Sequence, residues 1–193
     1  MRLEDIRGLE TSGDCYLVGN GDNLDVNKLT RFPSFATNLI NRIYHATNWR
    51  PTYYVCTDKV VLDNYKDEVI ENIRASKHSF LPEEALPMYN YDNVIPIIVK
   101  HDPFDDEITE GIYSPGTTLF TALKIAQWIG YDSVTFAGCN LYFGKELHFY
   151  PRRDDIMAKL SPEELSRRKL RSIQAHFWMI VYANKNKLRV RYI

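Results

Sequence analysis

The sequence feature that most constrains the fold is a short apolar run that ends in two closely spaced glycines. The run from Cys15 to Val18 is followed at once by Gly19-Asn20-Gly21 and then by Asp22, residues that favour a turn and a helix start. This pattern is typical of a buried strand that turns tightly into a helix. In an open α/β sheet, ligands bind in the crevice beyond such a strand end, where the glycines let the backbone approach a ligand and the helix offers unpaired N–H groups to an anion. We therefore predict that a phosphate-bearing substrate, a nucleotide or a nucleotide-sugar, lies on this turn.

Strand-like and helix-like patterns alternate along the rest of the chain. Short apolar runs predict strands over 33–38, 51–58, 94–99, 133–138 and 187–193. Apolar residues at helical spacing predict helices over 24–29, 60–76, 119–129 and 161–184. Residues 1–13 form a polar lead-in, and 80–93 and 101–111 are predicted as loops. The alternation predicts one Rossmann-like α/β domain over 1–193, with a mostly parallel sheet flanked by helices.

Two of these segments carry finer expectations. Pro96 lacks an N–H group, so the strand over 94–99 is expected at an edge of the sheet or at a bulge. The helix over 161–184 is expected to turn five apolar residues toward the core: Leu170, Ile173, Phe177, Ile180 and Val181. Its outer face then carries four cations: Arg167, Arg168, Lys169 and Arg171. A solvated face is the simplest interpretation of these cations, and an acidic partner or an acceptor glycan is the alternative.

Composition excludes several classes of protein. The chain has 193 residues, 45% of them hydrophobic and 25% charged, which is typical of a soluble globular domain. The formal net charge of −1 provides no global attraction to nucleic acid or to an anionic membrane. The N-terminus lacks the apolar core of a signal peptide, and no apolar run reaches the roughly 20 residues that span a bilayer. We therefore expect a cytoplasmic protein without a transmembrane segment and without a nucleic-acid partner.

The three cysteines do not have the spacing of a metal site. Cys15, Cys56 and Cys139 each fall inside or at the end of a predicted strand. We interpret them as small buried hydrophobic residues in a reducing compartment rather than as a disulfide or a metal centre.

Polar residues occur where several predicted strands end and where one helix begins. Asn20, Asn38, Asp58 and Asn140 each follow a strand, and the helix over 119–129 is preceded by a second polar group: Ser114, Gly116, Thr117 and Thr118. Each residue taken alone is also a common turn former. In a parallel sheet these ends lie on one edge, so the side chains are expected to converge on a shared pocket.

At this point the motifs resemble a known family. Gly19-Asn20-Gly21, Tyr113-Ser-Pro-Gly116 and Gly138-Cys-Asn-Leu-Tyr142 occur in the order and spacing of glycosyltransferase family 42, the bacterial sialyltransferases. The chain is also similar to the related motility-accessory and hydroxymethylpterin-diphosphokinase-like proteins. The resemblance covers residues 15–60 and 111–150 and, with the last helix and strand, over half of the chain, and it implies a Rossmann-like transferase.

The resemblance also implies roles for individual residues. Asn20 and Asn38 match asparagines that touch the CMP-sugar donor, and Ser114 matches a small residue that faces the donor. Tyr142 matches the first of two tyrosines that hold the leaving phosphate, with His148 or Tyr150 near the second.

The chain departs from the family at its catalytic positions. Asn140 replaces the aspartate of the family motif, Ile112-Tyr113 stands where an arginine is expected, and residues 151–163 contain no histidine. His148 is therefore the predicted catalytic base, because a histidine titrates near neutrality.

Three functions remain open on this reasoning. The first is a metal-free, nucleotide-sugar-dependent glycosyltransferase that acts on a surface glycan or lipopolysaccharide, as a monomer or a homo-oligomer. The second is a pterin-type diphosphokinase that requires Mg²⁺, for which Asp22, Asp58 and Asp105 are the candidate ligands. The third is a nucleotide-binding relative that has lost catalysis.

Overall fold

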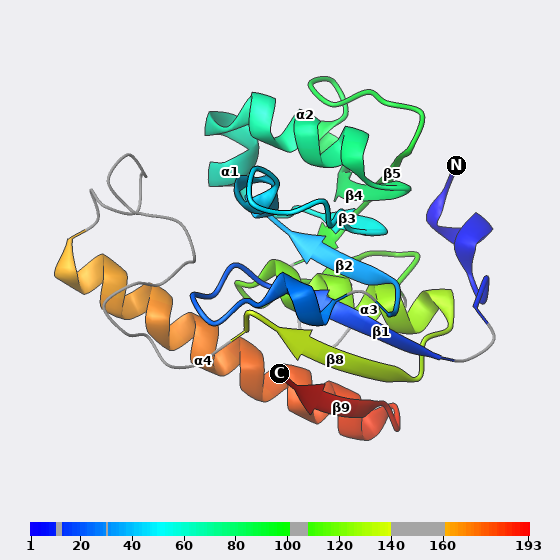
Figure 1. The fold of residues 1–193 in the computed structure, drawn as a ribbon, viewed down its shortest axis with the longest axis vertical. Helices are drawn as coiled ribbons and strands as arrows, with labels where there is room; N and C mark the ends of the chain where they lie inside the picture. Colours follow the sequence, from blue (N-terminus) through cyan, green and yellow to red (C-terminus); the bar gives the residue numbers. More distant parts are fainter. Residues whose placement is uncertain (11–12, 30, 101–107, 140–160) are drawn as a thin grey trace.

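The computed structural model describes residues 1–10, 13–29, 31–100, 108–139 and 161–193. Seven parallel strands form the main sheet in the order β5-β4-β3-β2-β1-β8-β9 (Figure 1). Their bounds are β1 (Asp14–Val18), β2 (Ser34–Thr37), β3 (Tyr53–Val55), β4 (His78–Pro82), β5 (Val94–Ile97), β8 (Ser133–Ala137) and β9 (Arg189–Tyr192). A second, two-stranded parallel sheet pairs β6 (Val99–Lys100) with β7 (Ile112–Tyr113).

Helices cover both faces of the main sheet. The α-helices are α1 (Lys59–Asn64), α2 (Lys66–Ala75), α3 (Thr118–Ile129) and α4 (Pro162–Lys185). Short 3₁₀ helices add η1 (Leu3–Ile6), η2 (Val26–Lys28), η3 (Ile40–Ile43) and η4 (Glu83–Ala85). Figure 1 shows α2 and α4 on opposite sides of the sheet, with α4 beside β8 and β9. In the described part of the chain, every helix is too short or too polar to cross a bilayer.

Side chains that alternate along the strands supply two cores, one on each face. On β1, Cys15 and Leu17 pack with residues of α3 and α4, whereas Tyr16 and Val18 pack with residues of α1, α2 and η3. This alternation is the period-two pattern of a strand buried on both faces. It explains why the strands read as continuous apolar runs in the sequence.

The order of the strands fixes where a ligand crevice can lie. From β1 the chain builds outward through β2 to β5, and it then returns to add β8 and β9 on the other side of β1. The direction of winding therefore reverses between β1 and β8. In parallel α/β sheets, ligands bind beyond the carboxyl ends of the strands at such a reversal. The Gly-Asn-Gly turn that follows β1 lies at this point.

The predicted α/β architecture is confirmed, and β5, with its proline, is an edge strand as expected. One predicted loop is wrong in part. Residues 80–93 were expected to lack regular structure, yet 80–82 complete β4 and η4 follows directly. The two prolines that suggested a loop are Pro82, the last residue of β4, and Pro87, which lies beyond η4. The predicted helix over 60–76 is divided at Tyr65 into α1 and α2, and the helix over 24–29 is a single 3₁₀ turn.

The expected orientation of α4 is also wrong. The apolar residues predicted to face the core are exposed: Leu170, Ile173, Phe177, Ile180 and Val181. The buried positions are instead Ala175, His176, Met179 and Ala183. Small side chains let α4 lie close to the sheet, so the face that packs is less hydrophobic than the face that does not.

Candidate functional site

The ends of β1 and β8 are joined by direct backbone contact. The Gly19 N–H donates to the Ala137 carbonyl over 2.9 Å, and the Gly21 N–H donates to the Gly138 carbonyl over 2.8 Å. A Cβ atom on Gly19 would lie 2.5 Å from the Gly138 carbonyl oxygen. Gly19 is therefore required by the packing of two strand ends, a reason that needs no ligand. Its predicted contact with a ligand stays a prediction.

Asn20 is the buried polar residue at the end of β1. Its side chain is 9% exposed, and its Nδ2 donates to the Thr37 carbonyl at the end of β2 over 3.0 Å. Its Oδ1 is buried and has no hydrogen-bond partner among the residues that the structure describes. A buried acceptor without a partner costs about 1–3 kcal/mol, and such atoms call for an explanation in a native structure.

Asn38 connects β2 to the first residue of α3. It adopts a left-handed backbone conformation with φ of 53°, and its Oδ1 accepts a hydrogen bond from Thr118 Oγ1 over 3.1 Å. Thr118 Oγ1 also lies 3.1 Å from Thr57 Oγ1, beyond the end of β3. The backbone carbonyl of Asn38 accepts hydrogen bonds from the Tyr54 hydroxyl (2.9 Å) and from Asn72 Nδ2 (3.0 Å). Residues far apart in sequence are thus linked in one polar network.

The start of α3 lies at the same edge of the sheet as Asn38. Thr117 caps the helix by accepting the Leu119 N–H, and Ser114 Oγ donates to the Thr117 carbonyl over 3.3 Å. Gly116 has φ of 86°, a value that favours glycine. The side chain of Arg171, on α4, lies next to Gly116. The first turn of α3 therefore directs its N–H groups and a polar loop toward the same edge as Asn38.

Several predicted residues come together in this arrangement, and others do not. Hydrogen bonds join Asn20, Asn38 and Thr118 to the ends of neighbouring elements, while Asp22 is exposed. Thr57 and Asn72 belong to the network but were not predicted. Five predicted residues lie outside the described residues: Asp105, Asn140, Tyr142, His148 and Tyr150. The binding roles of the predicted residues stay predictions.

Asp58 caps a helix, a structural role that the sequence pattern could not distinguish from contact with a substrate or a metal ion. Its carboxylate accepts the Val60 N–H over 2.9 Å and so caps α1. We expect Asp58→Ala to lower the free energy of unfolding by about 1 kcal/mol, the usual effect of losing such a cap. Denaturant unfolding measures this, and Asp58→Asn, which retains a capping oxygen, should lose only a few tenths. Equal losses in the two variants would contradict the capping role.

Burial shifts the pKa of several described histidine, cysteine and tyrosine side chains. His176 is buried against Phe136 on β8, and burial lowers its pKa. Cys15, Cys56 and Cys139 are all buried as expected, and burial raises the pKa of Cys139 to about 12. Among the described residues, no group of three or more His, Cys, Asp or Glu side chains has the arrangement of a metal site.

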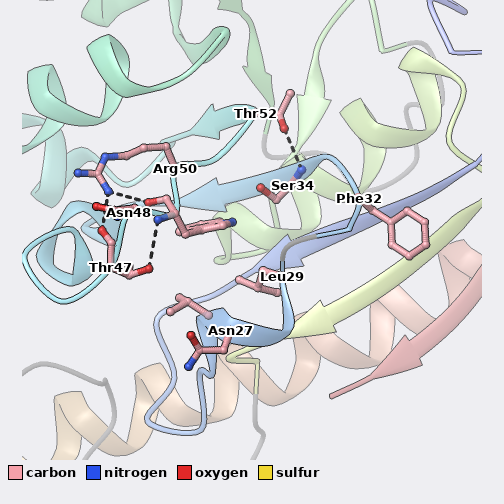
Figure 2. A pocket seen from close by; sticks show the side chains of 10 residues that line it. Asn27, Leu29, Phe32, Ser34, Thr47, Asn48, Arg50 and Thr52 are labelled. Atoms are coloured by element: carbon pink, nitrogen blue, oxygen red, sulfur yellow. Dashed lines mark hydrogen bonds between the residues drawn. The ribbon is translucent and has the colours of Figure 1, made fainter.

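A pocket of about 530 Å³ lies elsewhere, beside the starts of β2 and β3 (Figure 2). It is lined by Val26, Asn27, Leu29, Phe32, Ser34, Thr47, Asn48, Trp49, Arg50 and Thr52. The Arg50 guanidinium is held at its wall by the carbonyls of Thr47 and Trp49, at 2.9 and 2.7 Å. Ser34 begins β2 and Thr52 precedes β3, so this pocket lies at the amino ends of the strands. It does not contain the predicted site residues.

Comparison with solved structures relates this fold to known enzymes. The sialyltransferase CstII from Campylobacter jejuni, solved in complex with cytidine-5'-monophosphate, matches with a TM-score of 0.53 and 12% identity over 93% of this chain and 79% of that one. The monofunctional alpha-2,3-sialyltransferase Cst-I from Campylobacter jejuni matches with a TM-score of 0.53 and 14% identity over 93% and 74%. The chain shares its fold with these sialyltransferases.

A further match extends the comparison to a longer enzyme. The MAf glycosyltransferase from Magnetospirillum magneticum AMB-1 matches with a TM-score of 0.53 and 12% identity, over 78% of this chain and 30% of that chain. No protein-family model matches the sequence, and no curated protein matches it. The structural likeness confirms the fold that the sialyltransferase-like motifs implied, although the sequences are only 12–14% identical.

Proposed function

We propose that this protein is a nucleotide-sugar-dependent glycosyltransferase that uses a CMP-sugar-like donor and acts on a surface glycan or lipopolysaccharide. The observation that carries the proposal is Asn20, whose buried Oδ1 lacks a partner within the described part of the chain, at the point where the sheet reverses. Support comes from the shared fold, because CstII was solved with cytidine-5'-monophosphate.

The described residues suit the binding of a donor. Asn20 Oδ1 accepts a hydrogen bond from a hydroxyl or amino group of the nucleotide, a role that an amide oxygen fills and a hydrocarbon cannot. The N-terminus of α3 favours an anion, because the helix dipole is positive there. Thr57 and Asn38 hold Thr118 and so fix the first turn of α3.

Glycosyl transfer requires one base and one stabilised leaving group. The acceptor hydroxyl attacks the anomeric carbon of the sugar, the bond from that carbon to the phosphate oxygen breaks, and the hydroxyl proton passes to a base. We assign the base to His148 and the contacts to the leaving phosphate to Tyr142 and Tyr150, as the sequence analysis predicts. A positioned base contributes roughly 10²–10⁴-fold to the rate.

The test is a binding and turnover panel on the intact protein. We expect CMP and a CMP-sugar to raise the melting temperature, since a ligand that binds only the folded state stabilises it. Asn20→Ala should weaken CMP binding about tenfold, the effect of losing one well-placed hydrogen bond. Asn90→Ala, the same change at an exposed residue in the loop before β5, is the matched control and should leave binding unchanged.

The alternatives predict different results in the same panel. A pterin-type diphosphokinase binds ATP in the presence of Mg²⁺ and does not respond to CMP. A non-catalytic relative binds a nucleotide but turns over no donor, and His148→Ala leaves its binding unchanged. If CMP, UDP and GDP sugars all leave the melting temperature unchanged, the proposed function is wrong.

A further inference from the structure

The outer face of α4 is an exposed apolar surface. We use this name for six large residues, each between 38% and 61% exposed: Leu170, Ile173, Phe177, Trp178, Ile180 and Val181. Phe177 and Trp178 pack edge to face, with ring centroids 5.8 Å apart. Single exposed apolar residues are ordinary on a protein surface, but a contiguous group indicates a site of interaction.

The spacing of these residues places them in one continuous band. Leu170 and Phe177 are seven residues apart, as are Ile173 and Ile180, so each pair lies in a row along the helix. The next row contains Arg171, Trp178 and Lys185, again seven residues apart. The band is therefore bordered along one side by a tryptophan with a cation on each side of it.

Charge is distributed unevenly along the chain. Residues 161–193 contain eight Lys or Arg and two Glu, whereas residues 1–160 contain 16 Lys or Arg and 23 Asp or Glu. Both glutamates lie in the first turn of α4, where Glu164 pairs with Arg167 and Arg168. The segment that carries the exposed band is therefore strongly positive, although the whole chain has a net charge of −1.

We propose that the outer face of α4 docks on the surface of an anionic phospholipid bilayer. A helix with Phe, Trp and Leu on one side and Lys or Arg at the border lies in the interface, with its apolar side in the acyl region. Cations near an anionic surface add to the attraction, and their long side chains reach the headgroups. This is peripheral attachment and requires no helix that spans the membrane.

Charge favours a lipid surface over a second copy of the chain. Pairing two copies through α4 would bring together two segments that each carry eight cations against two glutamates, and like net charges at an interface oppose association. Among these cations, Arg167 and Arg168 form ion pairs within the chain with Glu164, and Arg189 forms one with Asp132. An anionic bilayer complements the same charges. The band has the correct apolar residues for either occupant, so charge is the observation that decides between them.

The test is co-sedimentation of the intact protein with vesicles. We expect binding to vesicles that contain phosphatidylglycerol and none to pure phosphatidylcholine. Binding should weaken when the salt is raised from about 0.1 M to about 1 M, because the Debye length falls from about 10 Å to about 3 Å. Phe177→Ser should weaken binding at least about tenfold through lost apolar burial. Arg171→Gln with Lys185→Gln should weaken it about 25-fold, from about fivefold for each cation.

Control variants separate membrane docking from a folding defect. Trp178→Phe keeps an aromatic side chain and should retain vesicle binding, but it should lose the fluorescence quenching that brominated lipid chains cause in the wild type. Melting temperatures of all variants should stay close to that of the wild type, because the changed side chains are exposed. These readouts do not depend on transferase activity.

Two results would overturn the proposal. One is a dimer in sedimentation velocity that Phe177→Asp converts to a monomer, without binding of the wild type to anionic vesicles. That result would make the outer face of α4 a subunit interface. The other is a monomer that binds neither kind of vesicle.

Discussion

Replacing Gly19 with alanine is expected to destabilise the protein by about 1–3 kcal/mol, the range for forcing an added group into a packed region. The new Cβ would lie 2.5 Å from the Gly138 carbonyl oxygen and 3.0 Å from Cys139 Sγ, so the ends of β1 and β8 have to separate. Denaturant unfolding measures the loss. For a chain of this length, each kcal/mol corresponds to about 2–4 °C in melting temperature.

Gly8→Ala is the matched control for this prediction. Gly8 has φ of 63°, so alanine is strained there, but a Cβ atom would meet nothing within 4 Å. Its cost should be about 1–2 kcal/mol, the usual penalty of a left-handed backbone. Gly19 is not in a left-handed conformation, so its loss arises from contact alone. Because the separation of β1 and β8 reaches the turn at Asn20, Gly19→Ala should also weaken nucleotide binding, whereas Gly8→Ala should not. A Gly19→Ala variant with wild-type stability would contradict the close contact of the two strand ends.

Much of the fold could be predicted because its local signals agree with one another. The apolar run of β1 ends at two glycines, and α3 begins at a threonine cap and ends at Gly130, which has φ of 120°. Each signal depends only on neighbours in sequence. Strand β4 was missed because its residues, His78 to Pro82, include polar side chains and a proline, yet the strand is held in the sheet by β3 and β5 on either side. Pairing with distant strands is not visible in a short window of sequence.

The predicted orientation of α4 was wrong for a different physical reason. Periodicity shows that a helix has an apolar face, but it does not show what that face contacts. Here the face that packs on the sheet is built around Ala175, Met179 and Ala183, and the more hydrophobic face is left exposed. An apolar helix face is certain to be buried in the protein only if the protein core is the one apolar environment that it can contact. The proposed membrane surface would be a second such environment.

The candidate site was partly predictable. Asn20 and Asn38 were recognised because each follows a strand, and parallel strands end at one edge. Thr57 was missed because it follows a run of aromatic and β-branched residues, and a threonine in that position is itself typical of a strand. Its position directly before Asp58, beyond the end of β3, was the available signal. Asn72 lies in the middle of α2, and only the three-dimensional fold brings it to the carbonyl of Asn38.

Two substitutions at Asn38 can distinguish the effect of its backbone conformation from the effect of its side-chain hydrogen bond. Alanine normally makes a protein more stable than glycine at the same position, because glycine loses more freedom on folding. At Asn38 the backbone is left-handed, with φ of 53°, so this order should reverse. We expect Asn38→Ala to be less stable than Asn38→Gly by about 1 kcal/mol in denaturant unfolding.

Both variants lose the same side-chain contact, so their nucleotide affinities should fall together. Each removes the acceptor for Thr118 Oγ1 and frees the first turn of α3, where the donor phosphate is proposed to bind. Thr118→Val removes the other half of this hydrogen bond at nearly constant shape and should weaken CMP binding to a similar extent, about tenfold. If the affinities of the two Asn38 variants instead follow their stabilities, then the backbone conformation, and not the bond to Thr118, is what organises this edge of the sheet.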